Sequence, residues 1–218
     1  MIYYQVLNQN KMLSIFLKML HCNYKMELLL IKELYNLKIW KLWSYGEPYD
    51  DLEMVEPMTF EERQSFDGRS KINDWIPRKV QKMDSNSNLV LGDYSGYLFS
   101  AMTKRAVNIL LPLMKENVEV LPLKCEYGEY YLINIITVLN CIDYEHAKYK
   151  MFSDQKRIMR FETYSFFEDK INQTHIFKII DEPVRKPFVS DTFKNAVEEA
   201  GLTGFRFELV WDSKQVVY

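Results

Sequence analysis

Glycine, and the motifs built on it, are scarce in this sequence. The 218 residues include 7 glycines, and no GxxxxGK[ST], GxGxxG, GxSxG or HExxH pattern occurs. Phosphate-binding loops and nucleophile elbows need such glycines because the backbone must turn sharply or approach a ligand closely. The absence of these motifs argues against an enzyme. It does not exclude one, because many active sites have no local sequence signature. The sequence nominates no catalytic residue.

Cysteine and histidine are also few, with three of each. Cys22, Cys125 and Cys141 form no CxxC pair, and their odd number argues against a disulfide framework and a cysteine-rich zinc site. Free thiols of this kind indicate a reducing cytoplasm. The best grouping of ligand types is Cys141, Asp143 and His146. A metal site needs further ligands, so we expect a strand-ending turn with a buried thiol there, and neither a metal nor another cofactor.

An excess of positive charge is missing as well. The net charge is −2 and the pI is about 6.0, whereas binding a phosphate backbone requires clustered Lys and Arg. We therefore expect no nucleic-acid partner. Residues 12–34 form the longest apolar stretch, but Lys18, His21 and Lys25 interrupt it, so no membrane-spanning segment and no membrane partner are predicted.

The first 36 residues differ in composition from the rest of the chain. They contain no Pro or Gly, and their Leu, Ile and Met are spread around a helix rather than along one stripe. Residues 1–36 are therefore predicted to be a helical extension or the product of an upstream start codon. The folded domain is predicted to span residues 37–218.

Short stretches rich in β-branched and aromatic residues predict strands along this domain. They lie at residues 38–43, 75–83, 118–124, 130–138, 158–167, 175–180 and 204–211. The strands at 118–124 and 130–138 flank Tyr127-Gly128 and are predicted to form a β-hairpin. Their nearly continuous apolar runs suggest central strands that are covered on both faces. A helix is predicted after Ser100, and another between Ser190 and Gly201, with each serine as N-cap. Pro112 should kink the first helix or end it near Leu111. Because strands and helices do not alternate strictly, we predict a single α+β domain with a mainly antiparallel or mixed sheet and a few packed helices.

Residues 47–62 carry seven acidic side chains, no Lys or Arg, and two prolines. This composition predicts a loop or irregular segment. Most charge runs are solvated faces, but an acidic surface could also attract a basic protein. The candidate binding residues of this surface are Asp50, Asp51, Glu53 and Glu56.

Five segments occur in a characteristic order. They are FDGRSKINDWIP from Phe66, GDYSGYLFSAMTKRAVNILLPL from Gly92, VEVLPLKCEYGEYYLINIITVLNCID from Val118, THIFKI from Thr174 and FVSDTFKNAVEEAGLTGFRFELV from Phe188. In this order the chain resembles, from residue 37 to residue 211, the eleventh immunity-protein family of bacterial polymorphic toxin systems. The resemblance implies an α+β fold, no catalytic residues, and a cytoplasmic protein that binds and neutralises a cognate protein toxin encoded by an adjacent gene.

Two functions of other classes remain open. One is a small metal-assisted or other enzyme, for which Cys141, Asp143 and His146 would be the site. The other is a structural interaction domain whose aromatic surface packs against itself, since aromatic residues make up 15% of the chain. The sequence predicts no oligomeric state and does not identify the toxin.

Overall fold

The computed structural model describes residues 36–84, 88–171 and 173–214. The predicted helical extension, residues 1–36, lies outside this part of the chain except for Asn36. The described residues from Leu37 onward form one compact unit. Its strands lie mostly in antiparallel sheets, and four helices occur among the described residues, which confirms the predicted α+β class.

The larger sheet has five strands in the order β11-β14-β15-β1-β16. These are Val138–Leu139, Ile176–Ile179, Phe188–Ser190, Lys38–Ser44 and Phe205–Asp212. The predicted opening and closing strands are confirmed as β1 and β16, which pair antiparallel along the whole length of β1. β1 pairs antiparallel with β15 on its other side, and β11 joins β14 in parallel. The two ends of the domain are therefore joined in one sheet.

A second sheet has the order β6-β7-β10-β8. Its strands are Tyr94–Ser95, Ala101–Thr103, Tyr130–Ile135 and Val118–Pro122. β8 and β10 form the predicted hairpin, and β10 is an inner strand, paired on both sides. Ile133 and Ile135 face the main core while Leu132 faces a smaller one, so β10 is covered on both faces, as its unbroken apolar run predicted.

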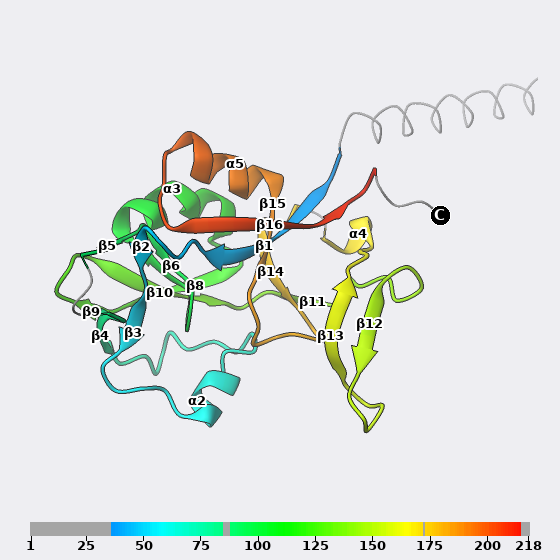
Figure 1. Ribbon diagram of the computed structural model, residues 1–218, viewed down its shortest axis with the longest axis horizontal. Helices are drawn as coiled ribbons and strands as arrows, with labels where there is room; N and C mark the ends of the chain where they lie inside the picture. Colours follow the sequence, from blue (N-terminus) through cyan, green and yellow to red (C-terminus); the bar gives the residue numbers. More distant parts are fainter. Residues whose placement is uncertain (1–35, 85–87, 172, 215–218) are drawn as a thin grey trace, which may run out of the picture. The chain divides into compact units, whose positions relative to one another are not determined.

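Helices α3 (Lys104–Met114) and α5 (Asp191–Glu199) lie together on one side of these sheets (Figure 1). Leu110 and Met114 of α3 pack with Phe193 of α5 and Leu42 of β1 in the main core. The N-terminus of α5 is capped as predicted, because the Ser190 hydroxyl accepts a hydrogen bond from the Phe193 amide at 3.2 Å.

The start and end of α3 correct two predictions. Thr103, not Ser100, caps the helix, and its hydroxyl accepts a hydrogen bond from the Ala106 amide at 3.2 Å. Residues 101–103 are extended because they pair with β10, which delays the helix. The helix also continues past Pro112 to Met114, so it does not end near Leu111, which was one of the two outcomes predicted for this proline.

Short elements complete the domain. They are β2 (Tyr49–Asp50), β3 (Leu52–Met54), α2 (Phe60–Gln64), β4 (Lys79–Lys82), β5 (Val90–Leu91), β9 (Lys124–Cys125), β12 (Lys148–Met151), β13 (Ile158–Thr163) and α4 (Glu168–Ile171). The loop predicted for residues 47–62 is thus only partly correct. Buried Leu52 and Met54 alternate with acidic residues to make β3, and a capping box between Thr59 and Glu62 starts α2.

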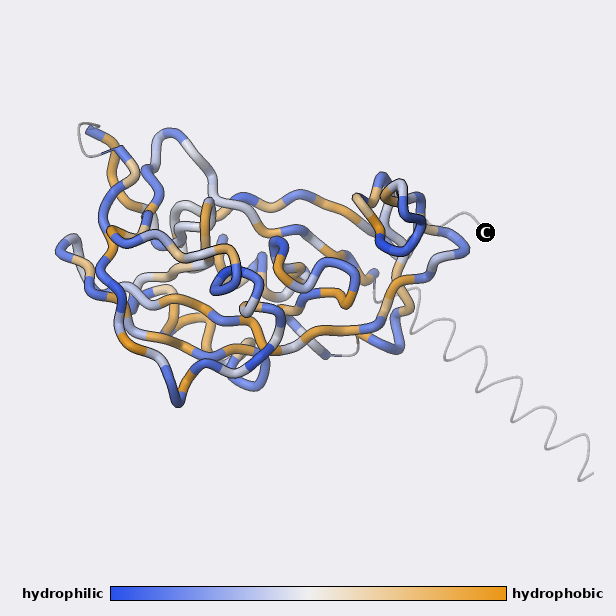
Figure 2. Tube along the Cα trace, turned by 90° about the horizontal axis from the view of Figure 1, so that it is seen from below, coloured by the Kyte–Doolittle hydropathy of each residue, from blue (hydrophilic) through white to orange (hydrophobic). Residues whose placement is uncertain are grey.

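Aromatic side chains fill a second core beneath β1 and β15. The ring centroid of Phe166 lies 5.7 Å from those of both Phe188 and Trp211. Ile39 of β1 is fully buried in the same cluster. Figure 2 shows the corresponding pattern along the trace, with apolar strand segments separated by mostly hydrophilic turns. Much of the high aromatic content is therefore core.

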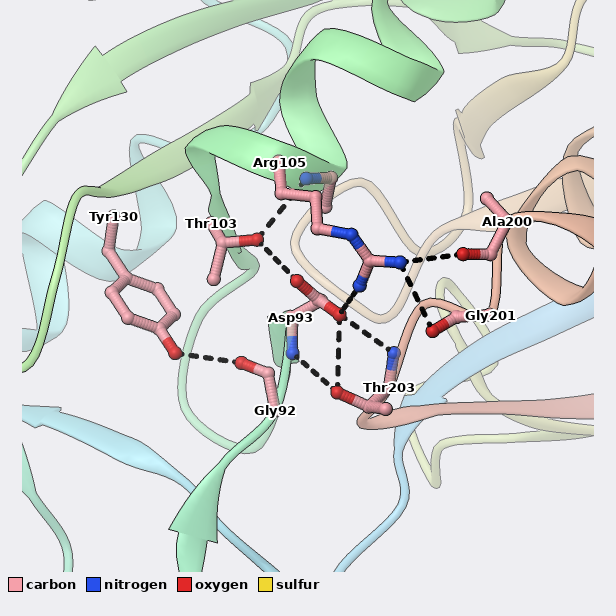
Figure 3. A network of polar contacts seen from close by, with 9 residues as sticks. Gly92, Asp93, Thr103, Arg105, Tyr130, Ala200, Gly201 and Thr203 are labelled. Atoms are coloured by element: carbon pink, nitrogen blue, oxygen red, sulfur yellow. Dashed lines mark hydrogen bonds and ion pairs between the residues drawn. The ribbon is translucent and has the colours of Figure 1, made fainter.

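One buried carboxylate joins the second sheet to both long helices (Figure 3). Asp93 precedes β6, and its Oδ1 accepts a hydrogen bond from the Thr103 hydroxyl at 2.7 Å. Its Oδ2 accepts from Arg105 Nη1 at 2.9 Å and from the Thr203 amide at 3.0 Å. Arg105 Nη2 also donates to the Ala200 carbonyl at 2.6 Å. Asp93 therefore connects the start of α3 to the segment that follows α5.

We predict that Asp93→Ala strongly destabilises the domain. The Thr203 amide and the Thr103 hydroxyl would each lose their acceptor. A buried donor left without an acceptor costs about 1–3 kcal/mol, so the free energy of unfolding should fall by about 3 kcal/mol. Urea denaturation followed by circular dichroism measures this. Asp154→Ala is the control, because Asp154 is exposed and bonds only within its own turn. Equal midpoints for the two variants would contradict the role given to Asp93.

Candidate functional site

The structure places the acidic candidates Asp50 and Asp51 inside the fold rather than on a free surface. Asp50 is 7% exposed. The Oδ1 atom of Asp51 accepts hydrogen bonds from the Ser95 hydroxyl at 2.9 Å and from the Gly96 amide at 3.0 Å. These bonds hold the turn that follows β6. The Asp51 carboxylate is therefore occupied within the domain, and replacing it would disturb this turn.

The other two candidates are more accessible. Glu53 is half-buried and accepts a hydrogen bond from Gln81 Nε2 at 2.8 Å, whereas Glu56 is exposed. Glu62 caps α2 and pairs with Arg78 at 2.9 Å, and the backbone hydrogen bond from Thr59 is the largest cause that lowers its pKa. Among the acidic side chains of residues 47–62, exposed carboxylates without a bonding partner in the described segments are those of Glu47, Glu56 and Glu61. The four candidates thus do not form one exposed patch.

The alternative site at Cys141, Asp143 and His146 is only partly assembled. His146 Nδ1 lies 2.6 Å from Asp143 Oδ2. Cys141 is fully buried in the second core, and this burial raises the pKa of its thiol to about 12. Within the described ranges, no three His, Cys, Asp or Glu side chains are grouped so that they could hold a metal ion. Cys141 is a core residue, as the sequence predicted for the buried thiol.

A cavity of about 660 Å³ opens between α2, strand β10 and strand β13. Its walls also include the loop at residues 97–100, Lys178 of β14 and the segment from Glu182 to Pro187. We call this cavity the basic cleft, because six basic side chains and one carboxylate line it. The basic residues are Lys41, Arg63, Arg160, Lys178, Arg185 and Lys186, and the carboxylate is that of Glu182. The cleft is thus positive in a chain whose net charge is −2.

The single carboxylate of the cleft is already paired. Lys41 Nζ lies 3.1 Å from Glu182 Oε2 and donates a hydrogen bond to the Tyr164 hydroxyl at 2.7 Å. The Tyr164 hydroxyl donates in turn to Glu182 at 3.0 Å. Burial and the adjacent Glu182 raise the pKa of Tyr164, which keeps it a hydrogen-bond donor. Glu182 therefore neutralises Lys41, and Arg160 lies 3.6 Å from Glu162, so the other four cations of the cleft have no ion pair among the described residues.

Lys178 is the most deeply buried cation of the cleft, with 6% of its surface exposed. Its Nζ donates a hydrogen bond to the Phe66 carbonyl at 2.6 Å, and no carboxylate of the described residues lies within ion-pair distance. Burial lowers the pKa of Lys178 to about 8, although the charge of Asp67 opposes this shift. A protonated Lys178 is therefore an electrostatic cost to the fold and a strong attractor for an anion.

Lys186 is held by two backbone carbonyls and an aromatic ring. Its Nζ donates to the carbonyls of Gly96 and Tyr97 and lies 5.9 Å from the ring centroid of Trp43. Burial lowers the pKa of Lys186. The same turn is bonded to Asp51, so the acidic segment and the cleft are joined through residues 95–97. Lys186 thus serves partly to position this loop.

Large apolar side chains surround the cations. Phe60, Tyr97, Leu98 and Met159 all line the cleft and are 63%, 58%, 49% and 39% exposed. Exposed apolar groups gathered around a concavity are typical of surfaces that bind a partner. We call these four residues the apolar rim. Cations, aromatic faces and exposed apolar groups together equip the cleft to bind an anionic group with apolar neighbours.

The sequence did not predict this cleft. Its basic residues come from separate parts of the chain between Lys41 and Lys186, and none belongs to a basic run. The adjacent Arg185 and Lys186, in a loop bounded by Pro183 and Pro187, were the nearest local sign. The antiparallel pairing of β1 with β15, and of β15 with β14, brings Lys41 near Lys178 and near the segment that precedes β15.

Residues 124–212 match the family model of an immunity protein family, Imm11. Over these residues the match confirms the resemblance recognised in the sequence. The matched part supplies the walls of the basic cleft that come from β10, β13, β14 and residues 182–187. No curated protein matches the chain. Within the segments that the structure describes, no helix is long and apolar enough to cross a membrane.

We predict that Lys178→Met stabilises the domain at neutral pH. A pKa lowered from 10.5 to about 8 corresponds to about 3 kcal/mol of unfavourable free energy while Lys178 is protonated in both states. Loss of the hydrogen bond to Phe66 offsets about 1 kcal/mol, so the free energy of unfolding should rise by about 1–2 kcal/mol at pH 7. Urea denaturation measures this difference, with the exposed Lys156→Met as control.

The same variant has an expected pH dependence. Between pH 8 and 10.5 the folded wild type loses the Lys178 proton while the unfolded chain keeps it, so wild-type stability rises with pH in this window. The advantage of Lys178→Met should therefore shrink from pH 8 upward. An advantage that is constant with pH, or absent at pH 7, would show that Lys178 is not held as a costly buried cation.

Proposed function

We propose that this protein is an immunity protein that neutralises a cognate bacterial toxin, encoded by an adjacent gene, by binding it directly in the cytoplasm. The match of residues 124–212 to an immunity protein family carries this proposal. The site geometry supports it, because the cleft presents cations and exposed apolar side chains that suit binding. The free thiols of Cys125 and Cys141 are consistent with a reducing compartment.

The alternative functions have less support from the structure. An enzyme centred on Cys141 would need that thiol to reach substrate, but it is fully buried. A self-associating structural domain would use exposed aromatic side chains such as those of Phe60 and Tyr97, but the family match favours an immunity protein instead. Direct binding of a toxin is therefore the function that the site supports best.

We predict that co-expression of this chain protects cells from the toxin encoded beside its gene. The two proteins should also co-purify, because direct inhibition requires a complex that outlives dilution. Colony counts with and without the chain, followed by affinity purification, measure both effects. Asp93→Ala, which weakens the fold, should protect less. Equal killing with and without the wild-type chain, and no co-purification, would refute the proposed function.

We also propose that the acidic segment at residues 47–62 contributes to binding through its exposed carboxylates, if the toxin is basic. Of the candidates Asp50, Asp51, Glu53 and Glu56, Glu56 alone is exposed, and Glu61, which is also exposed, lies close to it in the sequence. Rim charges act mainly on the association rate. Substitutions at these two positions therefore test the segment without breaking the internal hydrogen bonds of Asp51.

We predict that Glu56→Lys combined with Glu61→Lys slows association with the toxin by about 3-fold or more at low salt, and by less at higher salt because of screening. Surface plasmon resonance at two salt concentrations measures the rate. Glu116→Lys combined with Glu199→Lys is the matched control, because it makes the same change in net charge at exposed positions of other elements. If both pairs change the rate equally, the acidic segment has no specific part in the interface.

A further inference from the structure

The basic cleft has a charge opposite to that of its surroundings. Although the chain has a net charge of −2, six basic side chains gather around one cavity, and Glu182, the one carboxylate among the described residues that line it, is paired with Lys41. Arg63 and Arg185 are exposed, and their guanidinium groups have no bonding partner in the described segments. These cations are available to an incoming anion at no cost in internal bonds.

The apolar rim requires a partner larger than a small anion. Phe60 and Tyr97 are each more than half exposed at the edge of the cleft. A small anion would contact the cations of the cleft, and the rings of Phe60 and Tyr97 would stay exposed to solvent. A protein segment that lies across the cleft would bury them, and aromatic side chains beside arginines are typical of the residues that dominate protein interfaces.

The size of the cavity limits what can enter it. Cavities of about 300–1,000 Å³ bury a ligand of drug size, and the cleft has a volume of about 660 Å³. It can therefore take a few side chains of a partner but not a folded domain. The walls from β10, β13, β14 and residues 182–187 lie within the part that matches the immunity family, whereas the acidic segment at residues 47–62 lies outside it.

We infer that the basic cleft is the docking site for the toxin, and that it receives an acidic segment of the toxin whose neighbouring side chains are apolar. This inference rests on the proposed function and adds the surface and the chemistry of the contact. Carboxylates of the toxin pair with Arg63, Arg185 and Lys178, and its apolar side chains cover Phe60 and Leu98. The inference holds for a toxin of any net charge, because only the segment inserted into the cleft has to be acidic.

Two pairs of substitutions test this surface without touching buried residues. Arg63→Glu with Arg185→Glu reverses the exposed charges, and Phe60→Ser with Leu98→Ser removes part of the apolar rim. Their matched controls are Lys115→Glu with Lys124→Glu and Ile72→Ser with Ile76→Ser. All four control residues are exposed and none lines the cleft. Circular dichroism and urea midpoints establish that every variant is folded as the wild type is.

The measurement is the Kd for the product of the adjacent toxin gene, inactivated by mutation, in biolayer interferometry. Each cleft pair should weaken binding about 10-fold or more, and each control pair about 3-fold or less. Acidic-to-Lys substitutions in the inserted toxin segment should restore binding to Arg63→Glu with Arg185→Glu. If the wild type binds and protects but the cleft pairs behave as the controls do, the cleft is not the docking site and the proposed function stands.

Two further outcomes overturn the inference. If the wild type neither binds nor protects, the proposed function fails and the docking site fails with it. Titration calorimetry with ATP alone, in the absence of toxin, probes for a small anionic occupant. Stoichiometric binding of ATP that is lost in Arg63→Glu with Arg185→Glu, without any effect of ATP on the Kd for toxin, would assign the cleft to a small anion.

Discussion

The antiparallel pairing of β1 with β16 and β15 is the interaction on which the rest of the structure depends. It joins the first and last strands of the domain, so the sheet cannot form until nearly the whole chain is present. The two faces of β1 then serve two cores, with Leu42 in the main core and Ile39 in the aromatic one. The same strand contributes Lys41 and Trp43 to the basic cleft. Fold and site thus share one structural element.

The buried carboxylates of this domain have partners inside it, whereas one buried cation has no counter-charge. Asp51 and Asp93 are used to hold turns and helix ends, and Glu182 is used to neutralise Lys41. Lys178 has only a carbonyl as partner, which is unfavourable for an isolated domain because a buried charge without a counter-charge is costly. A complex could supply the missing counter-charge. A cleft in which Lys178 lacks a counter-charge is therefore physically reasonable as a binding surface.

Local signals in the sequence were sufficient where a structure is held by near neighbours. The helix between Ser190 and Gly201 and the hairpin of β8 and β10 needed only a cap, a turn and an apolar pattern, and both were predicted. The cap at Ser100 was wrong because β10, almost thirty residues further along, pairs with residues 101–103 and keeps them extended. At this position the long-range pairing with β10 overrides the local preference for a helix that begins at Ser100.

The sequence by itself determined the α+β class, the closing strand, the absence of familiar catalytic motifs and the resemblance to an immunity family. These depend on composition, periodicity and ordered segments, which need no knowledge of distant contacts. Only the tertiary structure decided that Asp50 and Asp51 lie within the fold and that Lys178 lies beside the cleft. Burial and counter-charges depend on which strands meet, and the strands that meet here are separated by most of the chain.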